Sequence, residues 1–283
     1  MVLESLMNPF SAKHKPWEMF FLGFFYLTIG VFLSMWVFAK YASLVMITLT
    51  VLALGPLLYT TMKSEEQFDC DLDNEKSILI EHSKSFSFLM WLFVGITIAC
   101  AFWYLALPEK TAGGLFNIQS ETITSINSRI TGLSIDYFQI FTKIFMNNFK
   151  VLIFCVLFAF IYGVGSIFIL TWNASVIGVA MGNFFRSHFA IYASAIGIVK
   201  VAGYFHIGSL SVLRYTLHGI PEVLAYFVGG MAGGIISVAI INHDFGTKNF
   251  EKILLDASDL VLMSVGLLLF AALLEVFVTP IFF

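Results

Sequence analysis

Charged residues are scarce in this sequence. Only 12% of its 283 residues are Asp, Glu, Lys or Arg, whereas a soluble domain carries roughly 25%. Hydrophobic residues make up 59% of the chain, and the net charge is only −3. The composition excludes a soluble globular domain, and the lack of a basic patch excludes nucleic acid as a partner. We therefore expect a multi-pass protein of the cell membrane.

Cysteines and catalytic motifs are also few. The three cysteines are Cys70, Cys100 and Cys155, and they form neither a CxxC pair nor a metal-ligand pattern. The sequence contains no HExxH, GxGD or serine nucleophile elbow. We therefore predict a protein without catalytic residues, a metal site or a cofactor, and we do not expect an enzyme.

Long apolar runs are what the sequence does contain. A run of about 20 apolar residues can cross the hydrocarbon core as a helix. The runs predict an all-α, polytopic helical membrane protein with about six full spans plus a pair of short or re-entrant helices. The six predicted spans are residues 19–38, 44–60, 86–107, 151–172, 221–241 and 260–283.

Polar segments divide the chain into three parts. Residues 1–107 comprise a polar stub, a two-helix hairpin, an acidic loop and the third span. Residues 108–150 comprise a polar loop and, from 135 onward, an interfacial amphipathic helix. Residues 151–283 form the core helical bundle. Seven acids lie among lysines in residues 62–85, and we predict that this segment is a solvated linker or a short surface helix, of which we favour the solvated loop.

Residues 174–217 do not fit a simple span. Only twelve apolar residues precede Arg186, and the next apolar stretch is interrupted by Lys200 and His206. Two half-helices that enter and leave the membrane would fit, because broken helices survive at membrane depth when packed within protein. Two full crossings also remain open. A lone crossing would hold Arg186 or Lys200 in the membrane, which is costly without a partner.

The stretch HGIPEVLAYFVGGMAGG, residues 218–234, is the predicted centre of the bundle. Pro221 suits the first turn of a helix, where its missing N–H costs nothing. Glu222 would then lie near the positive end of the helix dipole. Small-xxx-small spacing allows two helices to approach closely. The predicted helix-packing glycines are Gly163, Gly165, Gly178, Gly182, Gly229, Gly230, Gly233 and Gly234.

Four polar residues are predicted to converge within the membrane. Glu275 lies in an apolar span, about 8 Å along the helix from Pro280. Because the last two spans are antiparallel, Glu275 should lie level with His218 and Glu222. Asn173 joins them if the intervening pair makes zero or two crossings. The cluster is either a structural lock between helices, which we favour, or a functional centre.

Several motifs resemble the stage II sporulation protein M family. They are Asn148, the Gly163/Gly165 pair, Asn173 with Gly178, HGIPE with GGMAGG, and the closing FAALLEVFVTP. The resemblance covers about residues 135–283, and the N-terminal segment NPFSAKHKPWEMF is similar to longer archaeal members. The chain departs from the family pattern at Ala174, where the family has glycine, and at Leu217, where it has proline.

The resemblance implies a role in assembly. The bacterial namesake is a membrane scaffold that gathers peptidoglycan-degrading enzymes during sporulation, and only the idea of a membrane-embedded assembly partner carries over to an archaeal relative. We therefore expect a non-enzymatic scaffold or component of a membrane complex. Its expected partners are membrane lipids and either other membrane proteins or further copies of itself. The alternative is a transporter or channel for a small solute, ion or lipid that uses the intramembrane carboxylate.

Overall fold

The computed structural model describes residues 15–71, 75–131, 137–162, 166–189, 197–242 and 246–282. Within these ranges the chain is helical and contains no strand, which confirms the all-α class. The elements are α2 (Glu18–Val37), η2 (Ala39–Tyr41), α3 (Ala42–Asp71), α4 (Glu75–Ala106), α5 (Glu109–Leu115), α6 (Asn117–Thr131), α7 (Tyr137–Tyr162), α8 (Ser166–Phe189), α9 (Ile198–Asn242), α10 (Lys248–Leu273), η4 (Leu274–Val278) and α11 (Thr279–Phe282).

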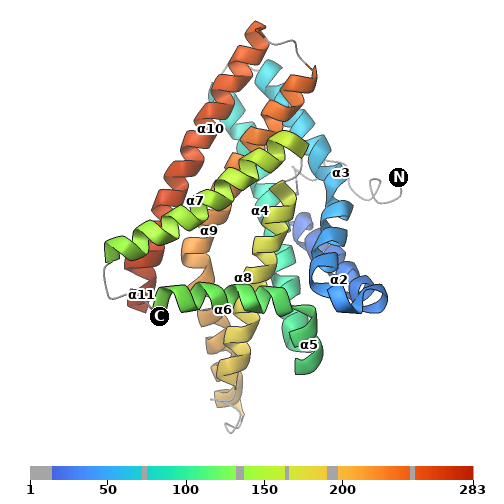
Figure 1. Cartoon of the computed structure of the whole chain (residues 1–283), viewed down its shortest axis with the longest axis vertical. Helices are drawn as coiled ribbons and strands as arrows, with labels where there is room; N and C mark the ends of the chain where they lie inside the picture. The colour runs from blue at the N-terminus through green and yellow to red at the C-terminus, as the bar shows by residue number, and fades with distance from the viewer. Residues whose placement is uncertain are drawn as a thin grey trace.

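Seven of these helices are long and apolar enough to cross a membrane: α2, α3, α4, α7, α8, α9 and α10, where α10 is Lys248–Leu273 and continues into η4 and α11. The chain is therefore a multi-pass membrane protein. Successive spans run in opposite directions, and α6 lies across one end of the bundle (Figure 1). The end of α8, the start of α9 and the end of the last span lie toward this same end, which we call the α6 side.

Helix α9 is the central element of the bundle. It packs against α3, α4, α7, α8 and α10, and most of its residues from Val223 to Ala239 are buried. Its 45 residues correspond to a length of about 67 Å, more than twice the roughly 30 Å of a hydrocarbon core. The N-terminal part of α9 continues with α8 past α6, beyond the rest of the bundle (Figure 1).

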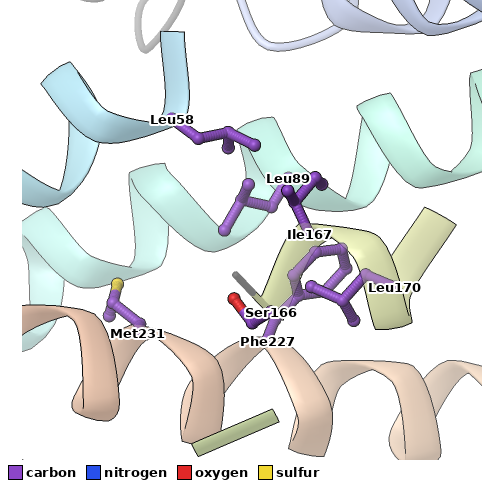
Figure 2. Close-up of a pocket in the computed structure, with 7 residues that line it drawn as sticks. All are labelled: Leu58, Leu89, Ser166, Ile167, Leu170, Phe227 and Met231. Carbon is purple, nitrogen blue, oxygen red and sulfur yellow. The ribbon is translucent and has the colours of Figure 1, made fainter. Parts of the chain in front are cut away.

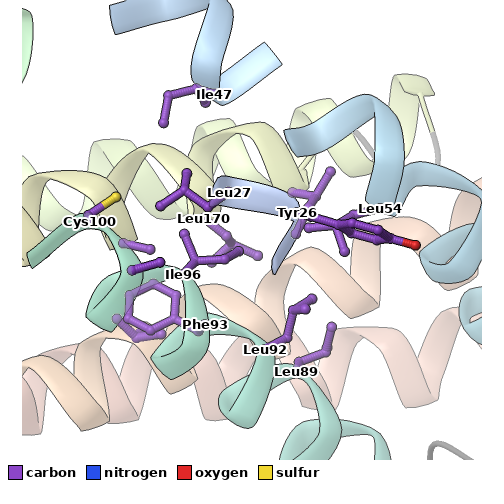
Figure 3. Close-up of a cluster of buried hydrophobic side chains, with 14 of the residues drawn as sticks. Tyr26, Leu27, Ile47, Leu54, Leu89, Leu92, Phe93, Ile96, Cys100 and Leu170 are labelled. Carbon is purple, nitrogen blue, oxygen red and sulfur yellow. The ribbon is translucent and has the colours of Figure 1, made fainter. Parts of the chain in front are cut away.

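The main hydrophobic core lies where α2, α3, α4, α8 and α9 meet (Figure 3). Phe93 of α4 and Phe227 of α9 pack edge to face, with ring centroids 6.0 Å apart. Beside them is a nearly closed cavity of about 10 Å³ (Figure 2), which is at the lower limit for one water molecule. Its lining is apolar except for Ser166. The core is thus filled by side chains and offers no room for a ligand.

Glycines bring the helices of the bundle into close contact. A methyl group at Gly178 of α8 would collide with the Thr97 carbonyl and the Cys100 side chain of α4. One at Gly233 of α9 would collide with the Val156 carbonyl of α7. Helix surfaces this close leave no space for any larger side chain. The close approach increases van der Waals contact between the helices, which stabilises their association within lipid.

The other predicted packing glycines have different surroundings. A methyl group at Gly182 would lie 2.8 Å from the Tyr104 ring, one at Gly229 would lie 2.5 Å from Leu152, and one at Gly230 would lie 3.0 Å from Ser166. Gly234 is buried in α9. Gly163 and Gly165 lie outside the described residues. The sequence analysis missed Gly23 of α2 and Gly95 of α4, which bring these two helices together.

The predicted span 151–172 and the predicted pair of half-helices at 174–217 are both wrong. Helix α7 ends at Tyr162, and α8 runs without a break from Ser166 to Phe189, so Asn173 lies inside a helix. The boundary was misplaced because Gly163 and Gly165 were assigned to a span interior, although glycine is the poorest helix former after proline.

Arg186 is accommodated by a contact that the sequence pattern does not reveal. Its guanidinium donates hydrogen bonds to the carbonyl oxygens of Tyr104 (2.6 Å) and Leu107 (3.2 Å) at the end of α4. It also lies 4.8 Å from the centroid of the Tyr104 ring. A helix end carries unpaired carbonyls and partial negative charge, so Arg186 finds favourable partners at the end of α8.

A helix start at Pro221 is also a wrong prediction, because α9 passes through this residue. Proline has no N–H to donate within the helix, but membrane helices tolerate it when neighbouring helices surround the site. The described residues of the predicted polar loop, 109–131, lie mostly in α5 and α6, and α7, which begins at Tyr137 within the predicted interfacial helix, is part of a span. Gln119 of α6 is buried and accepts a hydrogen bond from Ser43 (2.6 Å).

Of the two predictions for segment 62–85, the described residues agree with a helix and not with a loop, and some of them are buried. Helix α3 continues to Asp71 and α4 begins at Glu75. Glu65 is buried, its carboxylate lies 2.7 Å from His82 Nδ1, and it accepts a hydrogen bond of 2.7 Å from Ser85. The acidic pattern hid this buried pair because its basic partner lies seventeen residues away.

Replacing Gly178 with alanine should destabilise the bundle, because the added methyl group meets the backbone of α4. We expect Gly178→Ala to lower the melting temperature in mild detergent by about 3 °C or more. The matched control is Gly266→Ala in α10, where the methyl group meets no atom within 4 Å and alanine favours the helix. Equal melting temperatures for the two variants, measured by tryptophan fluorescence, would contradict the close α4–α8 contact.

Candidate functional site

A polar stripe runs along one face of α9. Arg214, His218, Glu222 and Tyr226 follow one another at intervals of four residues, which places them on the same side of a helix. The Tyr226 hydroxyl donates a hydrogen bond of 2.8 Å to the Glu222 carboxylate. Tyr226 is fully buried, so the stripe leads from the α6 side into the bundle.

Glu275 lies opposite this stripe in a short π-helical turn, η4. Both the backbone N–H and the hydroxyl of Thr279 donate to the Leu274 carbonyl, the latter over 3.1 Å. The next residue, Pro280, has no N–H to continue the ordinary α-helical pattern. A π turn is rare and is frequently found at functional sites. The local backbone thus presents Glu275 in an unusual position at the end of α10.

A cleft of about 710 Å³ opens between these elements on the α6 side. Its walls are mainly apolar and come from α6, α7, α8, α9 and the end of the last span. We call it the α6-side cleft. Its lining residues are Ile123, Tyr137, Ile140, Ile144, Val176, Ile177, Ala180, Arg214, Tyr215, His218, Glu275, Val276, Thr279 and Pro280.

The cleft is lined by one basic side chain, Arg214, and one acidic side chain, Glu275. Arg214 lies 5.6 Å from the centroid of the Phe184 ring, but none of the described residues accepts a hydrogen bond from it or pairs with it. Likewise, no described residue donates a hydrogen bond to the Glu275 carboxyl group. His218 Nδ1 lies 3.4 Å from the Thr279 hydroxyl. Both charged groups therefore face the cleft without a protein partner in the part of the chain that the structure describes.

Three of the four residues of the predicted polar cluster lie near one another. His218 and Glu275 line the same cleft, and Glu222 is close enough to Glu275 for the two carboxyl groups to interact electrostatically. Asn173 differs, because its amide donates a hydrogen bond of 2.8 Å to the Ile169 carbonyl of its own helix. It is not among the residues that line the cleft.

The sequence analysis missed Arg214, Tyr226 and Thr279. The signal was present: Arg214 and Tyr226 lie four residues before His218 and four residues after Glu222. Starting the helix at Pro221 removed the turn that carries Arg214 and so hid the stripe. Among the described residues, no group of three or more His, Cys, Asp or Glu side chains is arranged to hold a metal ion.

Removing the Tyr226 hydroxyl should destabilise the protein, because Glu222 would lose its donor inside the bundle. We expect Tyr226→Phe to lower the free energy of unfolding by about 1 kcal/mol. Tyr204→Phe is the matched control, since the buried Tyr204 hydroxyl has no hydrogen-bond partner and its loss should cost nothing. Unfolding in mild detergent measures both. A Tyr226→Phe variant as stable as the control would show that the hydrogen bond contributes no stability.

Comparison with known proteins agrees with the motifs in the sequence. Residues 87–280 match the family model described as stage II sporulation protein M. The match extends from α4 to the end of the last span and includes every residue that lines the α6-side cleft. No curated protein and no solved structure matches the chain. The match covers more than half of the sequence, and the chain belongs to the stage II sporulation protein M family.

Proposed function

We propose that this protein is a non-enzymatic scaffold, a component of a membrane complex that binds a partner protein on the α6 side. Membership of the stage II sporulation protein M family is consistent with this role. The observation that carries the proposal is a helical hairpin formed by residues 183–189 of α8 and 198–213 of α9. We call it the projecting hairpin, because it extends past α6 (Figure 1).

The projecting hairpin exposes large apolar side chains. Ile198 is 83% exposed and Phe205 is 77% exposed, and Phe189 and Val201 are exposed as well. Since α9 is far longer than the hydrocarbon core is thick, this surface lies at or beyond the membrane boundary. Exposed apolar patches outside the membrane are typical of protein interaction sites.

The projecting hairpin is also rigid in its connection to the bundle. Phe189 and Tyr204 stack with ring centroids 4.4 Å apart. Ser211 donates a hydrogen bond of 3.0 Å to the Met181 carbonyl, and Arg186 fixes the hairpin to the end of α4. A preformed surface loses little conformational entropy on binding.

Charge indicates what kind of partner would bind. Residues 174–217 contain no Asp or Glu but include Arg186, Lys200 and Arg214, so the segment has a net positive charge. A partner with an amphipathic helix would cover the apolar side chains, and acidic residues at the edge of that helix would be attracted by this net charge, although Arg186 itself is bound to α4. We therefore commit to a partner protein with an acidic amphipathic helix.

Exchanging one exposed apolar side chain tests this proposal. Phe205→Ser should abolish a stoichiometric complex, because Phe205 is a large apolar side chain that is 77% exposed on the projecting hairpin. Ile241→Ser is the matched control: Ile241 is 73% exposed at the opposite end of the same helix. The measurement is purification from native membranes in mild detergent, followed by native mass spectrometry of the intact complex.

Three outcomes are informative. A stoichiometric partner with an acidic amphipathic helix that is lost only in Phe205→Ser supports the proposal. A complex made of further copies of this chain replaces the proposed partner by self-association. A monomer free of partners in the wild type contradicts the scaffold role.

Glu275 is the observation that favours the transport alternative, because a carboxylate in a π turn beside a cleft could bind a substrate or proton. The scaffold proposal predicts no flux of ions or protons in liposomes that contain the purified protein. A flux in the wild type that Glu275→Gln removes, and that Glu251→Gln in the exposed first turn of α10 leaves intact, would favour the transporter.

A further inference from the structure

We propose that the α6-side cleft binds a phospholipid whose headgroup carries both a phosphate and a primary amine. This site is independent of the projecting hairpin and goes beyond the scaffold role. The ligand is inferred from the two opposite charges in the cleft, from its apolar walls and from its position at the end of the spans.

The α6-side cleft is lined by one basic and one acidic side chain that do not pair with each other. Arg214 and Glu275 line the same cleft, but they form no ion pair with each other, because their charged atoms are not within 4.0 Å. A charge that is removed from water without a partner is expensive. A ligand that carries one negative and one positive group would satisfy both side chains at once.

The chemistry of the two groups defines the headgroup. A guanidinium fits the oxygens of a phosphate, with which it forms short, charge-assisted hydrogen bonds. A carboxylate accepts hydrogen bonds from a primary ammonium group. A headgroup with a phosphate alone would bring a second negative charge toward Glu275, which disfavours binding. A quaternary amine would offer no N–H donor to the carboxylate.

The apolar walls define the rest of the ligand. Ile140 and Ile144 of α7 and Val176 and Ile177 of α8 line the cleft. A volume of about 710 Å³ is within the roughly 300–1,000 Å³ range of small-molecule sites. It can accept a headgroup and the first part of a hydrocarbon chain. A soluble headgroup without chains would leave these walls uncovered and should bind far more weakly.

The position of the cleft agrees with a lipid headgroup. Thr279 and Pro280 end the last span, and Tyr137 begins α7. Tyrosine is typical of the boundary between membrane and water. The cleft therefore lies at the depth at which headgroups occur, with its apolar walls continuing toward the hydrocarbon core.

Native mass spectrometry of the full-length, delipidated protein tests this inference. The probes are phosphatidylethanolamine, phosphatidylglycerol and phosphatidylcholine with identical chains, and free phosphoethanolamine as the soluble headgroup. We expect phosphatidylethanolamine to bind about tenfold more tightly than the other two lipids, as one additional charge-assisted contact would provide. Free phosphoethanolamine at the same concentrations should not displace it.

Two variants assign the charges. Glu275→Gln should remove the preference for phosphatidylethanolamine while phosphatidylglycerol binds as well as before or better. Arg214→Gln should weaken all three phospholipids by a similar factor, because each carries the phosphate. The matched controls are Glu251→Gln and Lys248→Gln, both at exposed positions at the other end of α10, and they should leave the lipid affinities unchanged.

Several results would overturn the inference. Equal affinities for the three lipids would show that lipid binding is not headgroup-specific. A preference that survives Glu275→Gln would place the amine elsewhere. Melting temperatures of the variants, measured in the same detergent, separate loss of the site from loss of the fold. Phe205→Ser should retain lipid binding, so failure of the scaffold proposal and failure of this one are distinguishable.

Discussion

The close contact of α9 with α7 and α8 is the interaction on which the rest of the bundle depends. Within lipid there is no hydrophobic drive to bring helices together, so their association relies on van der Waals contact and on interhelical hydrogen bonds. Gly229 and Gly233 allow α7 to approach α9, and Gly230 allows the start of α8 to do so.

Polar groups in the bundle fall into two kinds. Arg186 is bound to carbonyls at the end of α4, and Glu65 is bound to His82 and Ser85. These groups serve the fold, because their partners belong to the protein. Arg214 and Glu275 have no such partners among the described residues. This contrast distinguishes the α6-side cleft from the structural polar contacts elsewhere in the molecule.

The class of fold could be predicted because long apolar runs allow few alternatives. The level of Glu275 relative to His218 and Glu222 was also predictable, since antiparallel neighbours fix which helix ends meet. Helix boundaries were not predictable in the same way. Proline disfavours the interior of an isolated helix, yet α9 runs through Pro221 as part of the folded bundle.

Contacts between distant residues explain the remaining errors. A membrane crossing that contains Arg186 looks too costly in the sequence, because the carbonyl groups that bind this side chain, those of Tyr104 and Leu107, are about eighty residues away along the chain. Glu65 was assigned to solvent because acids surround it in the sequence, although the folded hairpin brings His82 to it. A sequence pattern describes the neighbours along the chain, whereas the cost of a charge depends on its neighbours in space.

The continuity of α9 has a mechanical consequence. One helix runs from the projecting hairpin to the opposite end of the bundle, and residues of the same helix line the α6-side cleft. A tilt of α9 about its packed glycine face would therefore move both of its ends. A tilt of about 5° would move a point twenty residues from this face by about 2.6 Å, given the helical rise. Force applied to the hairpin on one side of the membrane would reach the other side through this one rigid element.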